Sequence, residues 1–340
     1  MPLVRKVVIV LVDALPLDVL GCYGGFREST PGFDRLAALG AVFENALAAK
    51  VPGQGSAFGD AGNWTAAWNR VAAALRADGL TIEEHVCTTL NDLTEAAESE
   101  AIETFLTDPE PGVFTITGPE LVPPPVHGHL AVVDQAIASL HAAIEEADAA
   151  ETLFAVAALQ GASPDNGDFP RLTGSLVNVP LLIWTPAPVV PGLRSLGLTT
   201  PVDLLATALA WLERPAMPEL QAKDLQPLLR CEQDEVREEL LLEGPGEIGL
   251  RTIDRYAVVQ LPGTPTTSAI DGSAAGNGTR SASDLLGTAP EDFDGLLDRV
   301  AVFRKPADVW DRLDVGNTMP EERDELERRA RTLFAERTDS

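Results

Sequence analysis

The feature that most constrains the fold is an uninterrupted apolar run, Val7 to Val12, in which most side chains are β-branched. A strand that is apolar on both faces is typical of a parallel sheet covered by helices on both sides. Asp13 follows the run directly. Because open α/β sheets bind ligands at the carboxyl ends of their strands, the sequence predicts a polar group at a functional edge.

Two later apolar segments, 153–159 and 179–184, are short and bounded by polar, Gly or Pro residues, so we expect strands there. Segments with helical periodicity lie between the first two strands, at 31–39, 65–76 and 130–147. Strands that alternate with helices predict an α/β fold with a mostly parallel central sheet. We expect this core to span residues 1–235.

After residue 235 the pattern changes, and residues 236–340 are expected to form a smaller C-terminal α+β subdomain. Segments 238–242, 248–252 and 255–261 read as strands that are too close together for helices between them, which predicts an antiparallel sheet. A strand over 299–304 and a helix from Pro320 complete it. The Gly-, Ser- and Thr-rich stretch 263–287 is predicted to be a mobile surface loop.

The chain is strongly acidic, with 25 Lys and Arg against 52 Asp and Glu and a formal charge of −27. Such a charge repels polyanions, so neither nucleic acid nor an anionic membrane is an expected partner, whereas a protein partner of unknown identity stays open. The first apolar run is too short for a signal segment, and no stretch reaches the roughly 18 apolar residues of a membrane span. We therefore expect a cytoplasmic protein.

Residues 7–48 combine an apolar strand, an Asp at its end, the motif LGCYG at 20–24, Thr-Pro at 30–31 and a helix that leads to Phe-x-Asn at 43–45. This order resembles the opening of the sulfatase family within the alkaline phosphatase superfamily. Segments 178–183 (NVPLLI) and 200–205 (TPVDLL) resemble later motifs of the family, and the C-terminal strands and helix resemble its small subdomain. The resemblance implies an alkaline phosphatase-like core with a small antiparallel sheet and helix after it.

Members of that family hydrolyse sulfate or phosphate esters. The resemblance implies a divalent cation held by carboxylates at strand ends, and a nucleophile, either a Cys matured to formylglycine or a Ser/Thr, followed by an Arg. Asp13 matches the first metal ligand, and Ala14 stands where many members have a second acid. Gly53 and Ala57 stand at the positions of the nucleophile and the Arg. Ser56 is the nearby hydroxyl, but its spacing is not that of a nucleophile elbow.

The second metal-binding motif is also altered. Residues 159–162 (LQGA) stand where the family has Asp-His-Gly or Asp-Asn-Gly, and Asp165 and Asn166 spell that motif six residues downstream. Segment 82–85 (IEEH) lies where some sulfatases have Lys-x-His. His127 and His129 are too few for a closed zinc site and are more simply a helix start or a loop.

Three functions remain open. The first is a sulfatase-like pseudoenzyme with a binding or structural role and no cofactor, because one carboxylate cannot supply the six to eight oxygens that Ca²⁺ takes. The second is a divergent metal-dependent sulfuric or phosphoric ester hydrolase that uses Ca²⁺ or Mg²⁺ and draws on Asp13, Asp165, Asn166 and Ser56. The third is a solute-binding module with an apolar pocket near Asp13, lined by Trp64 or Trp68.

Overall fold

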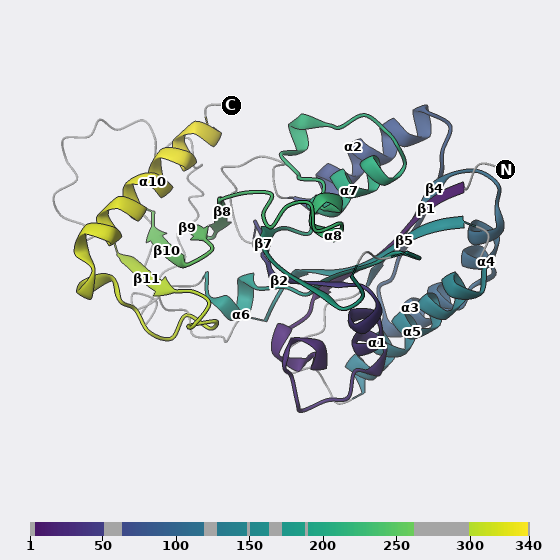
Figure 1. Ribbon diagram of the computed structural model, residues 1–340, viewed down its shortest axis with the longest axis horizontal. Helices are drawn as coiled ribbons and strands as arrows, with labels where there is room; N and C mark the ends of the chain where they lie inside the picture. Colours follow the sequence, from purple (N-terminus) through teal and green to yellow (C-terminus); the bar gives the residue numbers. More distant parts are fainter. Residues whose placement is uncertain are drawn as a thin grey trace, which may run out of the picture. The chain divides into compact units, whose positions relative to one another are not determined.

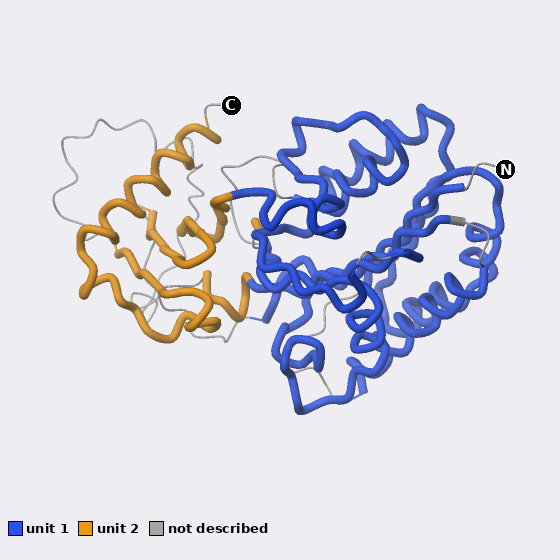
Figure 2. Tube along the Cα trace, viewed as in Figure 1, with its two compact units in different colours: residues 1–48, 60–162, 178–237 blue, residues 49–59, 163–177, 238–340 orange. Residues whose placement is uncertain are grey.

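The computed structural model describes residues 4–50, 63–118, 128–147, 150–162, 172–187, 190–261 and 299–338. The chain divides into two compact units, which are coloured separately in Figure 2. Unit 1 comprises residues 1–48, 60–162 and 178–237, and unit 2 comprises residues 49–59, 163–177 and 238–340. Across the described ranges, no helix has both the length and the apolar character that crossing a membrane requires.

Unit 1 is built on a seven-stranded sheet with the order β3-β4-β1-β5-β6-β2-β7. Its strands are β1 (Val4–Ala14), β2 (Ala41–Ala46), β3 (Thr81–Val86), β4 (Gly112–Gly118), β5 (Ala150–Gln160), β6 (Leu181–Trp184) and β7 (Leu193–Thr199). β6 runs antiparallel to both of its neighbours, β5 and β2, whereas the other described pairs are parallel. The mostly parallel α/β core predicted from the sequence is therefore confirmed.

β1 lies between β4 and β5 and pairs with both along nearly its whole length. Residues 7–12 are completely buried, as the apolar run predicts. The predicted strand at 153–159 is the central part of β5, whereas the one at 179–184 is shorter than expected and forms β6.

Helices cover both faces of this sheet (Figure 1). They are α1 (Pro31–Leu39), α2 (Trp64–Ala77), α3 (Leu90–Ala97), α4 (Glu100–Thr107), α5 (His129–Ala147), α7 (Asp203–Trp211) and α8 (Gln226–Leu229). In Figure 1, α1, α3, α4 and α5 lie on one side and α2, α7 and α8 on the other. The predicted helices at 31–39, 65–76 and 130–147 correspond to α1, α2 and α5.

The N-terminus of α1 is capped by a side chain from α5. Asp134 accepts hydrogen bonds from the backbone N–H groups of Gly32, at 3.0 Å, and Phe33, at 2.9 Å. A carboxylate at a helix N-terminus satisfies free donors and is stabilised by the helix dipole. A Cβ at position 32 would lie 2.3 Å from the backbone oxygen of Asp134, so this close approach requires glycine. The contact fixes α1 against α5.

A buried ion pair anchors the start of α7. The Asp203 side chain is fully buried and pairs with both terminal nitrogens of Arg237 at 2.6 Å. Asp203 also accepts hydrogen bonds from the backbone N–H groups of Thr200, at 2.7 Å, and Lys223, at 2.8 Å. One carboxylate thus joins three separate segments of unit 1.

Unit 2 contains a four-stranded antiparallel sheet with the order β11-β10-β9-β8, as the sequence predicts. Its elements are α6 (Gly174–Val177), β8 (Glu239–Gly244), β9 (Glu247–Thr252), β10 (Arg255–Gln260), β11 (Val300–Arg304) and α10 (Pro320–Thr338). Ala330 of α10 is fully buried with Ile248 and Leu250 of the sheet, and Leu333 packs at the border of this cluster. The predicted loop 263–287 lies outside the described residues.

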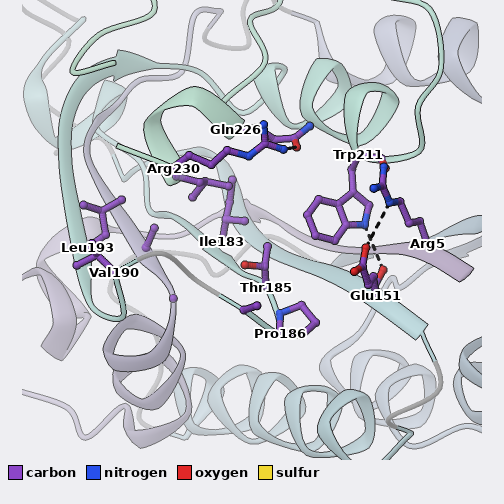
Figure 3. A pocket seen from close by; sticks show the side chains of 14 residues that line it. Arg5, Glu151, Ile183, Thr185, Pro186, Val190, Leu193, Trp211, Gln226 and Arg230 are labelled. Atoms are coloured by element: carbon purple, nitrogen blue, oxygen red, sulfur yellow. Dashed lines mark hydrogen bonds and ion pairs between the residues drawn. The ribbon is translucent and has the colours of Figure 1, made fainter. Parts of the chain in front are cut away.

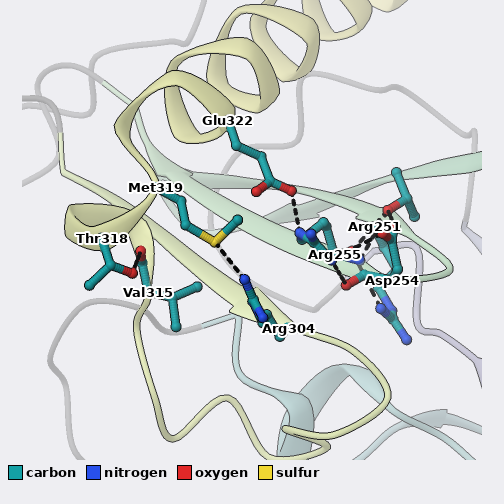
Figure 4. A network of polar contacts seen from close by, with 9 residues as sticks. Arg251, Asp254, Arg255, Arg304, Val315, Thr318, Met319 and Glu322 are labelled. Atoms are coloured by element: carbon teal, nitrogen blue, oxygen red, sulfur yellow. Dashed lines mark hydrogen bonds and ion pairs between the residues drawn. The ribbon is translucent and has the colours of Figure 1, made fainter.

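Polar contacts tie α10 and the preceding segment to the sheet of unit 2 (Figure 4). Arg255 of β10 forms an ion pair with Glu322 in the first turn of α10, and Arg304 donates to the Met319 sulfur at 3.3 Å. Deeper in the unit, the buried Lys305 ammonium lies 2.5 Å from a carboxylate oxygen of Asp311. Burial raises the pKa of Asp311 to about 6, although the Lys305 charge opposes this shift.

We expect Asp203→Ala to lower the free energy of unfolding by about 3–5 kcal/mol, because it leaves the Arg237 guanidinium buried without its counter-ion. Chemical denaturation followed by tryptophan fluorescence measures this loss. Glu145→Gln is the control, because it breaks an exposed pair with Arg35, 3.0 Å apart, and exposed pairs contribute about 0.2–1 kcal/mol. Equal losses in the two variants would contradict the anchoring role of Asp203.

A second prediction concerns His141 of α5, which is buried between the rings of Phe154 and Trp184, 6.1 and 4.8 Å away between centroids. No described group forms a hydrogen bond with its Nε2. Burial lowers the pKa of His141, and Arg35 adds to this effect while Glu145 opposes it. The unfolded chain then binds more protons than the folded one, so stability is full above the unfolded pKa of about 6.5 and falls as the pH drops below it.

His141→Gln removes this titration, so its stability should fall less steeply than that of the wild type between pH 7.5 and pH 5 in parallel denaturation series. His129→Gln, at the first residue of the same helix, is the control and should keep the wild-type slope. A wild-type slope in the His141 variant would refute the assignment.

Candidate functional site

The carboxyl ends of β1, β2, β3, β4, β5 and β7 lie at one edge of the sheet, since among the described strands only β6 runs the other way. Asp13 is the penultimate residue of β1 and is half-buried. Within the described part of the chain, no hydrogen bond or ion pair engages its carboxylate. Asp13 therefore presents a carboxylate without a partner among the described residues, at the edge where open α/β sheets bind ligands.

The residue beside Asp13 on the neighbouring strand is a leucine. In the β1–β5 ladder, Val12 lies opposite Ala158 and Ala14 lies opposite Gln160, so the register sets Leu159 beside Asp13. Paired residues of adjacent strands direct their side chains to the same face of the sheet. A carboxylate at position 159 would share a cation with Asp13, but a leucine side chain cannot bind one.

Ser56, Asp165 and Asn166 lie outside the described residues, as do the positions that correspond to the family's nucleophile and Arg, Gly53 and Ala57. Their roles stay predictions. In the ranges that the structure describes, no group of three or more His, Cys, Asp or Glu side chains is arranged to hold a metal ion. Asp13 is thus the described residue of the predicted metal set.

The thiols of Cys22 and Cys87 in unit 1 are not activated as nucleophiles. Burial, with a contribution from Asp34, raises the pKa of Cys22 to about 12. Burial and Asp92 raise the pKa of Cys87 to about 11. Because the thiolate is the nucleophilic form, both groups are protonated and inert near neutral pH.

The motif at residues 20–24 has a structural role. The Tyr23 hydroxyl donates to the backbone oxygen of Leu181 at 3.0 Å and accepts from the Leu181 N–H at the same distance. It also lies 3.3 Å from the backbone oxygen of Phe43. Burial raises the pKa of Tyr23, so the phenol stays protonated and able to donate. This side chain joins β2 to β6.

Other residues that carry the family resemblance also hold the backbone in place. The Thr30 hydroxyl accepts from the Gly21 N–H at 3.0 Å, and the Asn45 amide donates to the backbone oxygen of Leu196 at 2.7 Å. Asp203 lies in the segment TPVDLL and forms the buried pair with Arg237. Sequence reasoning identified these motifs but missed their hydrogen-bond partners, and the partners of Asn45 and Asp203 lie 151 and 34 residues away along the chain.

Three other side chains singled out from the sequence, Trp64, Trp68 and His85, pack against aromatic rings. Trp64 and Trp68 of α2 are buried and stacked, with ring centroids 6.4 Å apart, and the Trp68 indole donates to Glu84 at 2.9 Å. His85 stacks on Phe114 at 4.8 Å. His129 is the first residue of α5, in agreement with a helix start, whereas His127 lies outside the described residues.

Comparison with known proteins found no matching family model and no matching curated protein. Solved structures do match. A protein in complex with its substrate D-glucosamine-2-N,6-O-disulfate has a TM-score of 0.70 at 12% identity, covering 98% of this chain and 98% of that one. A 6S-sulf protein from Bacteroides thetaiotaomicron, described with the metabolism of multiple glycosaminoglycans, has a TM-score of 0.67 at 13% identity, covering 98% and 99%. A 2-O GAG sulfatase has a TM-score of 0.65 at 13% identity, covering 98% and 92%.

The chain therefore has a sulfatase-like fold, as the sequence resemblance predicted. At 12–13% identity the likeness is one of fold. The activity of this chain has to be argued from its own residues.

We expect Tyr23→Phe to lower the free energy of unfolding by about 1–3 kcal/mol, because it leaves backbone groups of Leu181 without a partner. Asp13→Ala should change it by less than about 0.5 kcal/mol, because the substitution breaks no hydrogen bond or ion pair among the described residues. Denaturant titration of both variants checks the pair. If Asp13→Ala lowered the free energy of unfolding more than Tyr23→Phe does, Asp13 would be the structural residue of the two, and the assignment would be wrong.

Proposed function

We propose that this protein is a sulfatase-like pseudoenzyme, which keeps the fold in a binding or structural role and no longer hydrolyses esters. The observation that carries the proposal is the leucine at position 159, which the strand register sets beside Asp13. The neutral Gln160 follows it at the end of β5. The two central strand ends thus supply one carboxylate instead of a set.

Charge and coordination explain why this substitution matters. A Ca²⁺ ion takes six to eight oxygen ligands, and Mg²⁺ requires near-ideal octahedral geometry. A bound cation neutralises the negative charge that develops on a transferred sulfuryl or phosphoryl group, so its loss would remove this stabilisation. Gly53 stands where the family resemblance expects the nucleophile, and glycine has no side chain to form a covalent intermediate.

The purified protein should contain less than one equivalent of calcium, magnesium or zinc by elemental analysis, and should not turn over 4-nitrophenyl sulfate or 4-nitrophenyl phosphate. Asp13→Ala should have the same metal content as the wild type. One equivalent of metal that disappears in Asp13→Ala, together with turnover, would overturn the proposal.

The alternative is a divergent metal-dependent ester hydrolase with Ca²⁺ or Mg²⁺ held by Asp13, Asp165 and Asn166 and with Ser56 as nucleophile. It is supported by the Asp165-Asn166 pair, which spells the family motif downstream of β5. It requires the Asp13 and Asp165 carboxyl groups to lie within about 8 Å of each other, because Ca²⁺–oxygen bonds measure about 2.3–2.6 Å. In this case Asp165→Asn would lower the metal content. Ser56→Ala would abolish turnover and leave the metal content unchanged.

If the protein has a noncatalytic role, its strongly acidic charge indicates what kind of partner it binds. A formal charge of −27 favours association with a basic or neutral protein surface and disfavours nucleic acid and anionic membranes. On this ground we propose a protein partner.

A further inference from the structure

The amino-terminal edge of the same sheet, opposite Asp13, holds a cavity of about 330 Å³ (Figure 3). Its walls come from the first residues of β1, β5 and β7, the residues after β6, the last residue of α7, and α8. All of these segments belong to unit 1. Because β6 is antiparallel to its neighbours, its carboxyl end joins their amino ends at this edge.

One wall of the cavity is a tryptophan held in a fixed orientation. The Trp211 indole N–H donates to the backbone oxygen of Glu151 at 3.2 Å. The Arg5 guanidinium lies 5.9 Å from the Trp211 ring centroid and donates to the Trp211 backbone oxygen at 3.1 Å. Ile183 and Leu193 add aliphatic surface to the same cavity. The result is a preformed apolar wall of the kind that small-molecule sites use.

The charge of Arg5 is already neutralised. Its guanidinium pairs with Glu151 at 3.3 Å and with Glu213 at 2.8 Å. This end of the cavity therefore has no surplus positive charge for a ligand. The role of Arg5 here is to position the Trp211 indole ring.

Arg230, the residue that follows α8, differs from Arg5. One terminal nitrogen donates to the side-chain oxygen of Gln226 at 2.6 Å, which orients the guanidinium (Figure 3). In the described part of the chain, Arg230 forms no ion pair. Burial raises the pKa of Asp224, and the nearby Arg230 charge only partly opposes this shift. Arg230 thus keeps planar N–H donors, which match the two oxygens of a carboxylate.

We propose that this cavity binds a small monocarboxylic acid, with its aromatic or aliphatic body against Trp211 and Ile183 and its carboxylate paired with Arg230. The volume of about 330 Å³ lies at the lower end of ligand pockets, which suits a body of one or two rings. A net charge of −27 disfavours polyanions such as multiply sulfated sugars, whereas one carboxylate faces one guanidinium. The site is independent of Asp13, so its failure would leave the proposed loss of hydrolysis untouched.

The probe for this proposal is 1-naphthoate, with the neutral 1-naphthalenemethanol as its matched control, titrated into the full chain by isothermal calorimetry. We expect saturable 1:1 binding of 1-naphthoate and at least about tenfold weaker binding of the alcohol. Arg230→Gln should weaken 1-naphthoate about tenfold or more and leave the alcohol unchanged. Val190→Trp, at an exposed residue of the cavity rim, should fill the cavity and remove binding of both compounds.

Arg312→Gln is the control for net charge, because Arg312 is an exposed arginine of unit 2, and it should bind 1-naphthoate as the wild type does. Unfolding midpoints of all variants verify that they are folded. Absence of saturable binding to the wild type would overturn the proposal. Equal affinity for acid and alcohol, or equal losses in Arg230→Gln and Arg312→Gln, would also overturn it.

Discussion

The burial of β1 on both faces is the constraint on which the rest of the structure depends. A strand enclosed by β4, β5 and two helical layers exposes no side chain between Arg5 and Asp13, so it can contribute to chemistry only near its ends. Asp13 stands near one end and Arg5 near the other, roughly 26 Å apart at about 3.3 Å per residue. The two candidate sites of unit 1 are thus the two ends of a single strand, and the sheet keeps them separate.

The motif residues that this chain keeps are those that hold backbone segments together. Tyr23 joins β2 to β6, Asn45 binds the backbone of Leu196, and Asp203 pairs with Arg237. A chain that stopped hydrolysing esters would still need these contacts in order to fold, because leaving buried polar groups unpaired is costly. If ester hydrolysis is lost as we propose, selection for the fold alone would account for the motifs that this chain shares with the family.

The sequence was sufficient to predict the elements with a continuous or periodic apolar pattern, such as β1, α1 and α5. It did not reveal the edge strand β3, because Glu83 and Glu84 interrupt any apolar pattern there and edge strands often carry charge. Asp13 could be found because it directly follows an apolar run, and the opposing Leu159 because the family motif marks that position. The cavity at the other edge could not be predicted. Its walls come from segments that are distant in the sequence. Arg230 is a candidate ligand-binding residue because the fold places no carboxylate within ion-pair distance of it among the described residues.

The cap of α1 has a consequence for how the chain is made. The groups that satisfy the first turn of this helix belong to Asp134, 102 residues after Gly32. A ribosome adds about 5–20 residues per second, so the start of α1 emerges roughly 5–20 s before its cap exists. During this interval the helix terminus must be solvated or sheltered by other factors. Docking of α5 then supplies this cap, so the first turn of α1 reaches its final hydrogen bonding only after the middle of the chain has been synthesised.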